Sequence, residues 1–289
     1  MVLGPADGMC AGAYVRGRAT GMREFDVLSP RHLVPAIHAI LLTGGSAYGL
    51  GAADGVMRWL RERGRGFPVG VGVVPIVPTA VVFDLGPVGR SDRWPGSDDG
   101  YAACDAAGAR VAEGSVGAGT GATVGKALGV EHAMKGGIGT WAVRAGDLVV
   151  GALAVVNAFG DVLDAGGRIL AGARDGAGFA DARSRLAAGA RPFSRWGNTT
   201  LAVVGTNAAL DRHQLTEVAR AAADALSWRI RPVGTAVDGD VVFAVATGGG
   251  LTADALRVEL LAQDVVAASI ERAVTQARGE GGVPGLKDT

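Results

Sequence analysis

The spacing of apolar residues predicts short buried strands that alternate with amphipathic helices. Residues 36–43 form a short apolar run closed by Gly44 and Gly45, which is typical of a buried strand that ends in a turn. A helix is predicted over residues 52–63, because apolar side chains recur there every three or four positions and Gly64 offers a C-cap. A buried strand is thus followed by a helix that covers it.

The same order returns in the second half of the chain. Residues 148–157 and 201–205 are apolar and β-branched, which predicts two central strands. Residues 212–228 and 252–278 show helical periodicity. In the last helix the expected apolar stripe consists of Leu256, Leu260, Leu261, Val265, Val266 and Ile270. Strands that precede helices in both halves indicate two sheets covered by helices.

Three further segments have weaker patterns. Residues 69–82 are β-branched but contain Pro75 and Pro78, so edge or irregular strands are expected. Residues 101–113 resemble a helix of small residues. Residues 166–198 are rich in Ala, Gly and Arg with little periodicity, which predicts a mobile loop. A structureless loop of this length inside a compact domain needs a special reason, and chain processing at its end would be one.

Composition and charge exclude several classes of protein. The 289 residues are 48% apolar, enough for one buried core, and we expect a single domain over residues 1–289. Lys plus Arg equals Asp plus Glu at 28 each, so no net charge attracts a nucleic acid or an anionic membrane. The start has no signal-peptide pattern, and no apolar run reaches the roughly 20 residues of a membrane helix. We therefore expect a cytoplasmic protein.

The glycine-rich segment 117–126 raises the alternative of a non-catalytic nucleotide-binding protein. A phosphate-binding loop of the Walker type would need glycine at position 120 and a hydroxyl residue at position 127, where the chain has Thr120 and Ala127. Lys126 stands alone in an uncharged stretch, so it is either exposed to solvent or held for its charge. The four histidines lack the spacing of metal ligands, and no cofactor or metal ion is expected.

The sequence Asn198-Thr199-Thr200 before the strand at 201–205 has two interpretations. One is a polar entry into the strand. The other is chemical: the Thr199 hydroxyl attacks the carbonyl that precedes it, and cleavage frees an α-amino group beside that hydroxyl. An α-amino group has a pKa near ~7.7 to 8.0, so it can accept the hydroxyl proton at neutral pH. No histidine is then required.

Asp238 and Asp240 flank Gly239 ahead of an apolar strand. Their spacing of two places both carboxylates on one face of an extended segment. Asp-Gly-Asp is also good turn chemistry, so a solvated turn is the alternative to a carboxylate pair that orients the new ammonium or hydroxyl group.

Seven ordered segments together resemble the family of L-aminopeptidase/D-esterases and nylon-oligomer (6-aminohexanoate-oligomer) endo-hydrolases. The resemblance runs from about Gly17 onward over nearly the whole chain. Family members usually open with a strand similar to GVRVGH, which has no counterpart after Met1. The matching segments are HAILLTGGSAYGLGAADGVMRWL, VPIVPTAVVFDL, GYAAC, GATVGKALG, ALAVVNAFGDV, GNTTLAVVGTNAAL and DGDVVFAVATG.

This resemblance implies an α/β protein with the αββα sandwich of N-terminal-nucleophile hydrolases. It implies self-cleavage between Asn198 and Thr199 into chains 1–198 and 199–289, and a homo-oligomer of these processed heterodimers. The site residues that it implies are Thr199 as the nucleophile, Lys126, Asn157, Asp238 and Asp240. The expected substrate is a small peptide or a 6-aminohexanoate-type oligomer. An aminopeptidase or esterase that acts on N-terminal residues is the alternative, although those members more often place Ser after Gly at the cut.

Overall fold

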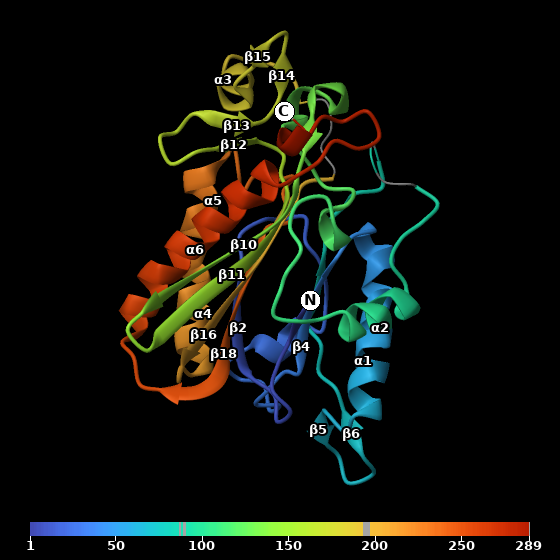
Figure 1. The fold of residues 1–289 in the computed structure, drawn as a ribbon, viewed down its shortest axis with the longest axis vertical. Helices are drawn as coiled ribbons and strands as arrows, with labels where there is room; N and C mark the ends of the chain where they lie inside the picture. Colours follow the sequence, from blue (N-terminus) through green and yellow to red (C-terminus); the bar gives the residue numbers. More distant parts are fainter. Residues whose placement is uncertain (87, 89–90, 193–196, 289) are drawn as a thin grey trace.

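A mixed five-stranded sheet forms the centre of the computed structural model, which describes residues 1–86, 88, 91–192 and 197–288 (Figure 1). Only β16 and β18 in this sheet are parallel; the other neighbours are antiparallel. In spatial order the strands are β10 (Gly137–Ala145), β11 (Leu148–Asn157), β16 (Thr199–Ala208), β18 (Val241–Leu251) and β2 (Cys10–Val15). The two strands predicted at 148–157 and 201–205 are therefore neighbours at its centre.

A second sheet of four short strands packs against the first. Its order is β1 (Val2–Leu3), β4 (Ala39–Thr43), β7 (Thr79–Val81) and β3 (Gly21–Arg23). The strand predicted at 36–43 is confirmed as β4. The expectation of edge or irregular strands over 69–82 was wrong for β7, which is buried inside the sheet, because both prolines precede its ladder. That expectation holds for the outlying hairpin of β5 (Phe67–Pro68) and β6 (Val73–Val74).

Helices cover the outer faces of both sheets (Figure 1). The five-stranded sheet is covered by α4 (Arg212–Ala222), α5 (Asp224–Arg229) and α6 (Ala255–Thr275), and the second sheet by α1 (Ala52–Glu62) and α2 (Ser97–Asp105). This confirms the predicted αββα sandwich. Within the described residues, no helix has the length and apolar character required to cross a membrane.

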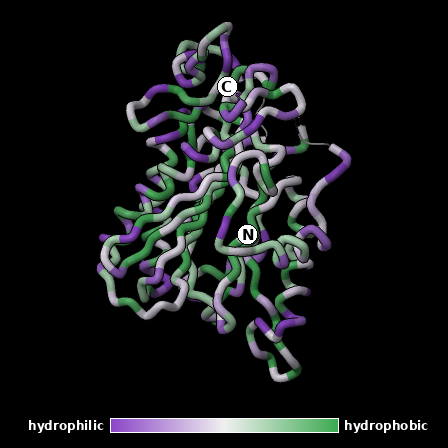
Figure 2. The backbone as a smooth tube through the Cα atoms, in the orientation of Figure 1, coloured by the Kyte–Doolittle hydropathy of each residue, from purple (hydrophilic) through white to green (hydrophobic). Residues whose placement is uncertain are grey.

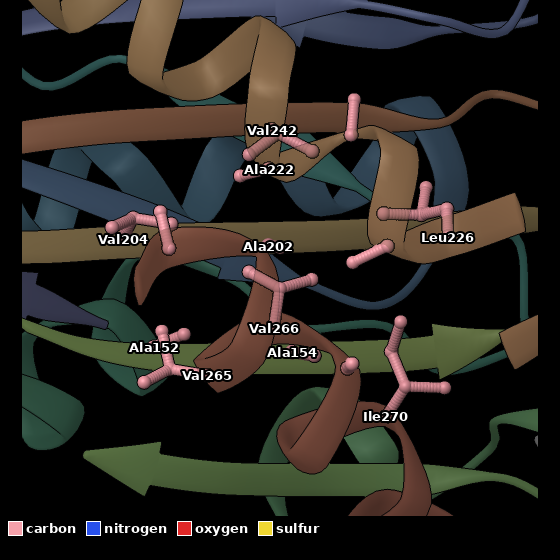
Figure 3. Packing of buried hydrophobic residues seen from close by; sticks show 14 of the residues in the cluster. Ala152, Ala154, Ala202, Val204, Ala222, Leu226, Val242, Val265, Val266 and Ile270 are labelled. Atoms are coloured by element: carbon pink, nitrogen blue, oxygen red, sulfur yellow. The ribbon is translucent and has the colours of Figure 1, made fainter. Parts of the chain in front are cut away.

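Alternation along the central strands divides the apolar core into layers. On β11, Ala152 and Ala154 face the helices, whereas Leu153 and Val155 face the second sheet. Figure 3 shows the helix-facing layer, in which the small side chains of β11 and β16 lie opposite larger ones of α6. Hydrophobic positions line the strands and hydrophilic ones the outer turns (Figure 2). Asn157 continues the Leu153–Val155 face, so strand alternation directs it between the two sheets.

Several helix predictions need correction. The helix expected at 101–113 is α2, which begins earlier, where the Asp99 carboxylate accepts the Gly96 N–H, and ends at Asp105. The single helix expected at 212–228 is two consecutive helices. Leu256 and Leu260 were wrongly placed in the apolar stripe, since they are 58% and 54% exposed. The buried stripe of α6 begins at Val258 and continues through Val265, Val266 and Ile270.

The loop expected over 166–198 is largely structured. It contains β13 (Ile169–Ala171), β14 (Arg174–Asp175), β15 (Gly178–Phe179) and α3 (Ala182–Ala187). Its order comes from tertiary contacts: the buried carboxylate of Asp161, in β12 (Asp161–Leu163), accepts the N–H groups of Ala173 and Ala182 at 2.7 Å each. Such long-range bonds leave no periodicity in the sequence. Residues 193–196 of the expected loop lie outside the described residues.

Candidate active site

The predicted cleavage junction lies at the buried start of β16. Thr199 is directly opposite Asn157 in the β11–β16 ladder, and the two are 4% and 1% exposed. The Thr199 hydroxyl donates to the carbonyl oxygen of Asn198 at 2.6 Å. The Gly239 N–H donates to the same oxygen at 2.9 Å. The carbonyl that Thr199 would attack is thus already polarised by a backbone donor.

Gly239 cannot be replaced at this position without displacement of its neighbours. A Cβ atom there would lie 2.8 Å from the Thr199 hydroxyl oxygen and 2.6 Å from the carbonyl oxygen of Ala19. The missing side chain allows the backbone donor to approach the junction.

Lys126 is buried, so the alternative of a solvent-exposed lysine was wrong. It follows β8 (Thr123–Val124) through Gly125, whose φ of +70° lies in the left-handed region. The Lys126 ammonium donates to the carbonyl oxygen of Gly197 at 2.7 Å. It also donates to the side-chain and main-chain oxygens of Asn157 at 2.8 and 3.0 Å. These three acceptors match the three ammonium hydrogens, which does not favour the phosphate-binding interpretation.

Asn157 connects Lys126 to the junction. Its side-chain oxygen accepts the Thr123 N–H at 3.0 Å in addition to the Lys126 ammonium. Its amide nitrogen donates to the carbonyl oxygens of Phe83 at 2.9 Å and Gly197 at 3.2 Å. The Gly197 carbonyl, one residue before Asn198, is therefore held by both predicted polar residues.

The predicted carboxylate pair also reaches the junction. Asp240 accepts the N–H of Thr200 at 2.7 Å and that of Gly234 at 3.1 Å. Asp238 accepts the N–H and the hydroxyl of Thr235 at 2.8 and 2.7 Å. Both carboxylates are 1% exposed, so they do not form a solvated turn. The Asp240 carboxylate thus binds the residue after Thr199, whereas Asp238 meets the junction through the backbone bridge that pairs it with Asn198.

Burial moves the pKa values of these groups toward neutrality. Desolvation lowers the pKa of Lys126 to about 7, against the opposing effect of the Asp238 and Asp84 charges. Desolvation and, to a smaller extent, the charge of Asp238 together raise the pKa of Asp240 to about 7. Burial also raises the pKa of Asp238, which hydrogen bonds from Thr235 counteract. Perturbed pKa values of this kind cluster at functional sites.

A pocket of about 610 Å³ lies between the two sheets. Leu153 and Val155 of β11 line it, on the strand face that Asn157 continues. Asp84 also lines it and accepts the Gly45 N–H at 2.7 Å. Burial raises the pKa of Asp84, whereas the Lys135 and Lys126 charges lower it.

Asp84 was not singled out from the sequence, where it is a single acidic residue at the end of an apolar run. The residue before it, Phe83, accepts a hydrogen bond from the Asn157 side chain through its carbonyl oxygen.

A protein-family model describes residues 3–281 of this chain as "Peptidase family S58". The chain belongs to peptidase family S58. Among its relatives, an uncharacterised aminopeptidase of Mycobacterium tuberculosis is 46% identical over 258 residues, which cover 84% of this chain and 72% of the relative. A 6-aminohexanoate-oligomer endohydrolase of a Kocuria species is 32% identical, over 73% of this chain and 60% of that relative. The resemblance read from the seven segments is confirmed.

Solved structures agree on the fold of this S58 chain. The PH0078 protein of Pyrococcus horikoshii matches with a TM-score of 0.70 at 18% identity, over 97% of this chain and 78% of that protein. The L-aminopeptidase D-Ala-esterase/amidase of Ochrobactrum anthropi, described as a variant of the Ntn hydrolase fold, matches with a TM-score of 0.64 at 21% identity, over 96% of this chain and 75% of that enzyme. The family makes this chain an amide-bond hydrolase, and the structural likeness gives it the Ntn hydrolase fold.

Proposed function

We propose that this chain cleaves itself between Asn198 and Thr199 and then hydrolyses small amides with Thr199 as its amino-terminal nucleophile. One observation carries the proposal: the Thr199 hydroxyl lies against the Asn198 carbonyl, whose oxygen accepts the Gly239 N–H. A nucleophile and a donor for the developing oxyanion therefore meet at one peptide bond.

Self-cleavage proceeds as an N-to-O acyl shift followed by hydrolysis. The Thr199 oxygen bonds to the Asn198 carbonyl carbon and loses its proton, while the Gly239 N–H stabilises the oxyanion. The Asn198–Thr199 C–N bond then breaks, and the departing nitrogen takes up a proton. Water hydrolyses the resulting ester to an Asn198 carboxyl group and a free Thr199. Lys126 and Asp240, each with a pKa of about 7, are the groups in this cluster that can accept and return the proton before any α-amino group exists.

The uncut chain occupies part of its own site. The Gly197 carbonyl takes up donors from Lys126 and Asn157. After cleavage, residue 198 is a chain end, and its withdrawal together with Gly197 frees both donors for a substrate carbonyl. One such donor contributes about 3 kcal/mol to stabilisation of a transition state. Cleavage thus creates the nucleophile and exposes the groups that assist it.

Turnover then follows the same chemistry on a substrate. The Thr199 hydroxyl attacks the substrate amide carbon, the new α-amino group accepts the hydroxyl proton, and this proton passes to the departing amine. Water releases the acid from the Thr199 ester. Asp238 and Asp240 position the segment that bears the amine and hydroxyl through their bonds beside Asn198 and Thr200.

The pocket supports a substrate with a free amino group near the scissile amide. Its apolar lining includes Leu153 and Val155. Its charged lining has the carboxylates of Asp84, Asp99 and Glu280 against the Arg93 guanidinium, and Met1, which carries the amino group of the chain, also lines it. An apolar chain that ends in an ammonium group fits this lining. Small peptides and 6-aminohexanoate-type oligomers both have this character. Asp84 also favours the aminopeptidase alternative, in which the residue removed carries the free amine.

We place the processed enzyme in the cytoplasm as a homo-oligomer of heterodimers. Cys10 and Cys104 are both free thiols, as expected in a reducing compartment. Leu256 and Leu260 lie exposed on α6 and could be covered by a second copy. Light scattering on the purified protein measures the assembly directly.

The decisive experiment is intact-mass analysis of the purified 29.0 kDa chain. We expect two chains that correspond to residues 1–198 and 199–289, with the smaller beginning TTLAVVGTNA. A different start would assign the nucleophile to another residue. An active preparation that remains a single uncut chain would refute the proposal, and an inactive uncut one would favour the non-catalytic alternative.

A further inference from the structure

Two exposed aromatic rings lie together at the wall of the pocket between the sheets. The rings of Tyr48 and Trp94 stack, with their centroids 4.4 Å apart and an angle of 22° between their planes. Trp94 lines the pocket, whereas Tyr48 stacks on it from outside the lining. The two residues are nevertheless 60% and 43% exposed. A large aromatic surface that stays accessible in a pocket favours contact with a ligand.

The turn at Gly44 and Gly45 places this aromatic wall beside a carboxylate. Gly45 has a φ of +83°, in the left-handed region, and a Cβ atom there would lie 2.5 Å from the Cβ atom of Trp94. The Gly45 N–H donates to one carboxylate oxygen of Asp84 at 2.7 Å. A Cβ atom at Gly44 would clash with the other oxygen of Asp84. Two adjacent glycines therefore allow a carboxylate and an aromatic ring to approach the same turn.

The pocket has room for a substrate side chain at this wall. Its volume of about 610 Å³ falls within the roughly 300–1,000 Å³ of small-molecule sites. Pro95 continues the wall after Trp94, and Leu41 of β4 and Ala52 of α1 add further apolar lining. An amino-terminal residue with an aromatic side chain thus finds an anionic group for its amine and an aromatic wall for its ring.

We propose that Trp94, supported by Tyr48, is a specificity-determining residue that selects substrates whose amino-terminal residue carries an aromatic side chain. This inference rests on the proposed function, because it assigns the pocket to the substrate and takes up the aminopeptidase alternative. Contacts between aromatic rings stabilise a complex beyond the burial of apolar area alone. The substrate makes this contact when it binds and keeps it in the transition state, so the contact lowers KM more than it raises kcat.

Three amides with the same leaving group test the role of the side chain. L-Phenylalaninamide and L-alaninamide differ only in the phenyl group, and 6-aminohexanamide has no side chain beside its amide. The first two carry their ammonium group at the same position, so the ionisable groups of the pocket, the Met1 amino group among them, affect both alike. Release of ammonia measures the hydrolysis of all three.

Three variants of Trp94 separate aromatic contact from bulk. Trp94→Ala removes both, Trp94→Leu keeps apolar bulk without an aromatic ring, and Trp94→Phe keeps a ring. The control is Trp228→Ala, at a tryptophan that is 42% exposed and lies outside the pocket lining. Self-cleavage and melting temperature are recorded for each variant. Since Trp94 is 43% exposed, we expect its variants to fold and to be cut.

We expect kcat/KM of the parent to be at least about thirtyfold higher for L-phenylalaninamide than for L-alaninamide. Trp94→Ala and Trp94→Leu should reduce this ratio at least about tenfold, mainly through KM, with smaller losses on the other two probes. Trp94→Phe should keep most of the ratio, and Trp228→Ala should match the parent. If Trp94→Ala does not fold, the Trp94→Leu result decides.

A parent that hydrolyses 6-aminohexanamide but shows no preference for L-phenylalaninamide would overturn the inference alone. A folded Trp94→Leu variant that keeps the preference would do the same. Equal losses on all three probes would also overturn it, since they would indicate a structural role of the aromatic pair. A parent that hydrolyses none of the three probes would overturn the proposed function, and this inference with it.

Discussion

The two ends of β16 carry the same residue types in different surroundings. At its start, Thr199 lies opposite Asn157 on β11. At its other end, Thr206 and the half-buried Asn207 contact the beginning of β11. The Asn207 side chain accepts the Val149 N–H and donates to the carbonyl oxygen of Asp147, both at 2.8 Å, and the Thr206 hydroxyl donates to Val149 at 3.1 Å. These bonds fasten the β10–β11 hairpin.

The start of β16 differs in burial and charge. Lys126, Asp238 and Asp240 gather there, each nearly inaccessible to solvent, and burial shifts their pKa values toward neutrality. The far end has hydrogen bonds alone. A threonine and an asparagine side by side between β16 and β11 therefore do not distinguish the two ends of β16; the buried charged groups beside Thr199 do. The far end supplies matched controls for the threonines and for Asn157.

The largest expected effect is the difference in cleavage and amidase activity between alanine variants at Thr199 and Thr206. Thr199→Ala removes the attacking oxygen from both proposed reactions, so we expect a folded, uncut chain without amidase activity. Thr206→Ala should be cut and active, with only the modest loss of stability expected when a hydroxyl bond is removed, about 1 kcal/mol. A denaturing gel and an amidase assay measure both outcomes.

Thr199→Ser retains a hydroxyl and should keep part of both activities. Cleavage or amide hydrolysis by Thr199→Ala would show that the nucleophile is another residue, and the contrast between the ends of the strand would lose its basis.

The two asparagines should differ in catalysis more than in stability. Asn157→Ala removes a donor and the acceptor of Lys126, and we expect kcat to fall at least about a hundredfold, roughly 2.7 kcal/mol in barrier. Asn207→Ala should keep kcat within about twofold and lose about 1 to 2 kcal/mol of unfolding free energy, because it removes two hydrogen bonds. Steady-state kinetics and urea unfolding on cleaved protein test this pair. Comparable kcat values in the two variants would show that Asn157, like Asn207, contributes to stability and not to catalysis.

The sequence predicted the parts of the site that local chemistry marks. Thr199 follows an asparagine at the start of a strand, and the spacing of Asp238 and Asp240 implied a shared face. Two central strands and the layered architecture followed from apolar periodicity. The roles of Asn157 and Lys126 came from the family resemblance, since neither residue has a local pattern that requires burial.

Other features depend on contacts between distant segments and could not be predicted. Asp84 lines the pocket and accepts the Gly45 N–H, whereas Lys135 lies behind the pocket wall and donates to the carbonyl oxygen of Gly119. The segment after residue 166 is ordered by Asp161, whose role has no periodic signal. Leu256 and Leu260 recur at helical spacing, yet they lie on another face of α6 than the fully buried Val258, so they stay exposed.

A smaller effect concerns the pH dependence of stability, which arises at the charged end. The pKa of Lys126 is about 7 in the folded chain, whereas that of a fully solvated lysine is 10.5. The unfolded chain therefore binds more protons between these values, and the unfolding free energy rises with pH in that window. Lys126→Met should reduce the gain between pH 7 and pH 9 by about 2 kcal/mol.

Urea unfolding in the Thr199→Ala background measures this gain without interference from cleavage. Lys287→Met is the control and should keep the parent's pH slope. An unchanged slope in Lys126→Met would mean that Lys126 is charged in the folded chain throughout this range.

The smallest expected effect is a change in unfolding free energy that has opposite signs at the two ends of β16. Thr200 is fully buried, and its hydroxyl finds no hydrogen-bond partner among the residues that the structure describes. An unsatisfied buried hydroxyl costs stability, so Thr200→Val should raise the unfolding free energy by about 1 kcal/mol. The Thr206 hydroxyl has two partners, Val149 and Ala208, so Thr206→Val should lower the unfolding free energy by about the same amount.

Strand alternation directs Thr200 away from the Thr199 face, so Thr200→Val should also be cut normally. Urea unfolding of both valine variants in the Thr199→Ala background and a gel of Thr200→Val alone provide the readouts. Loss of stability or of cleavage in Thr200→Val would mean that the second threonine also serves the junction.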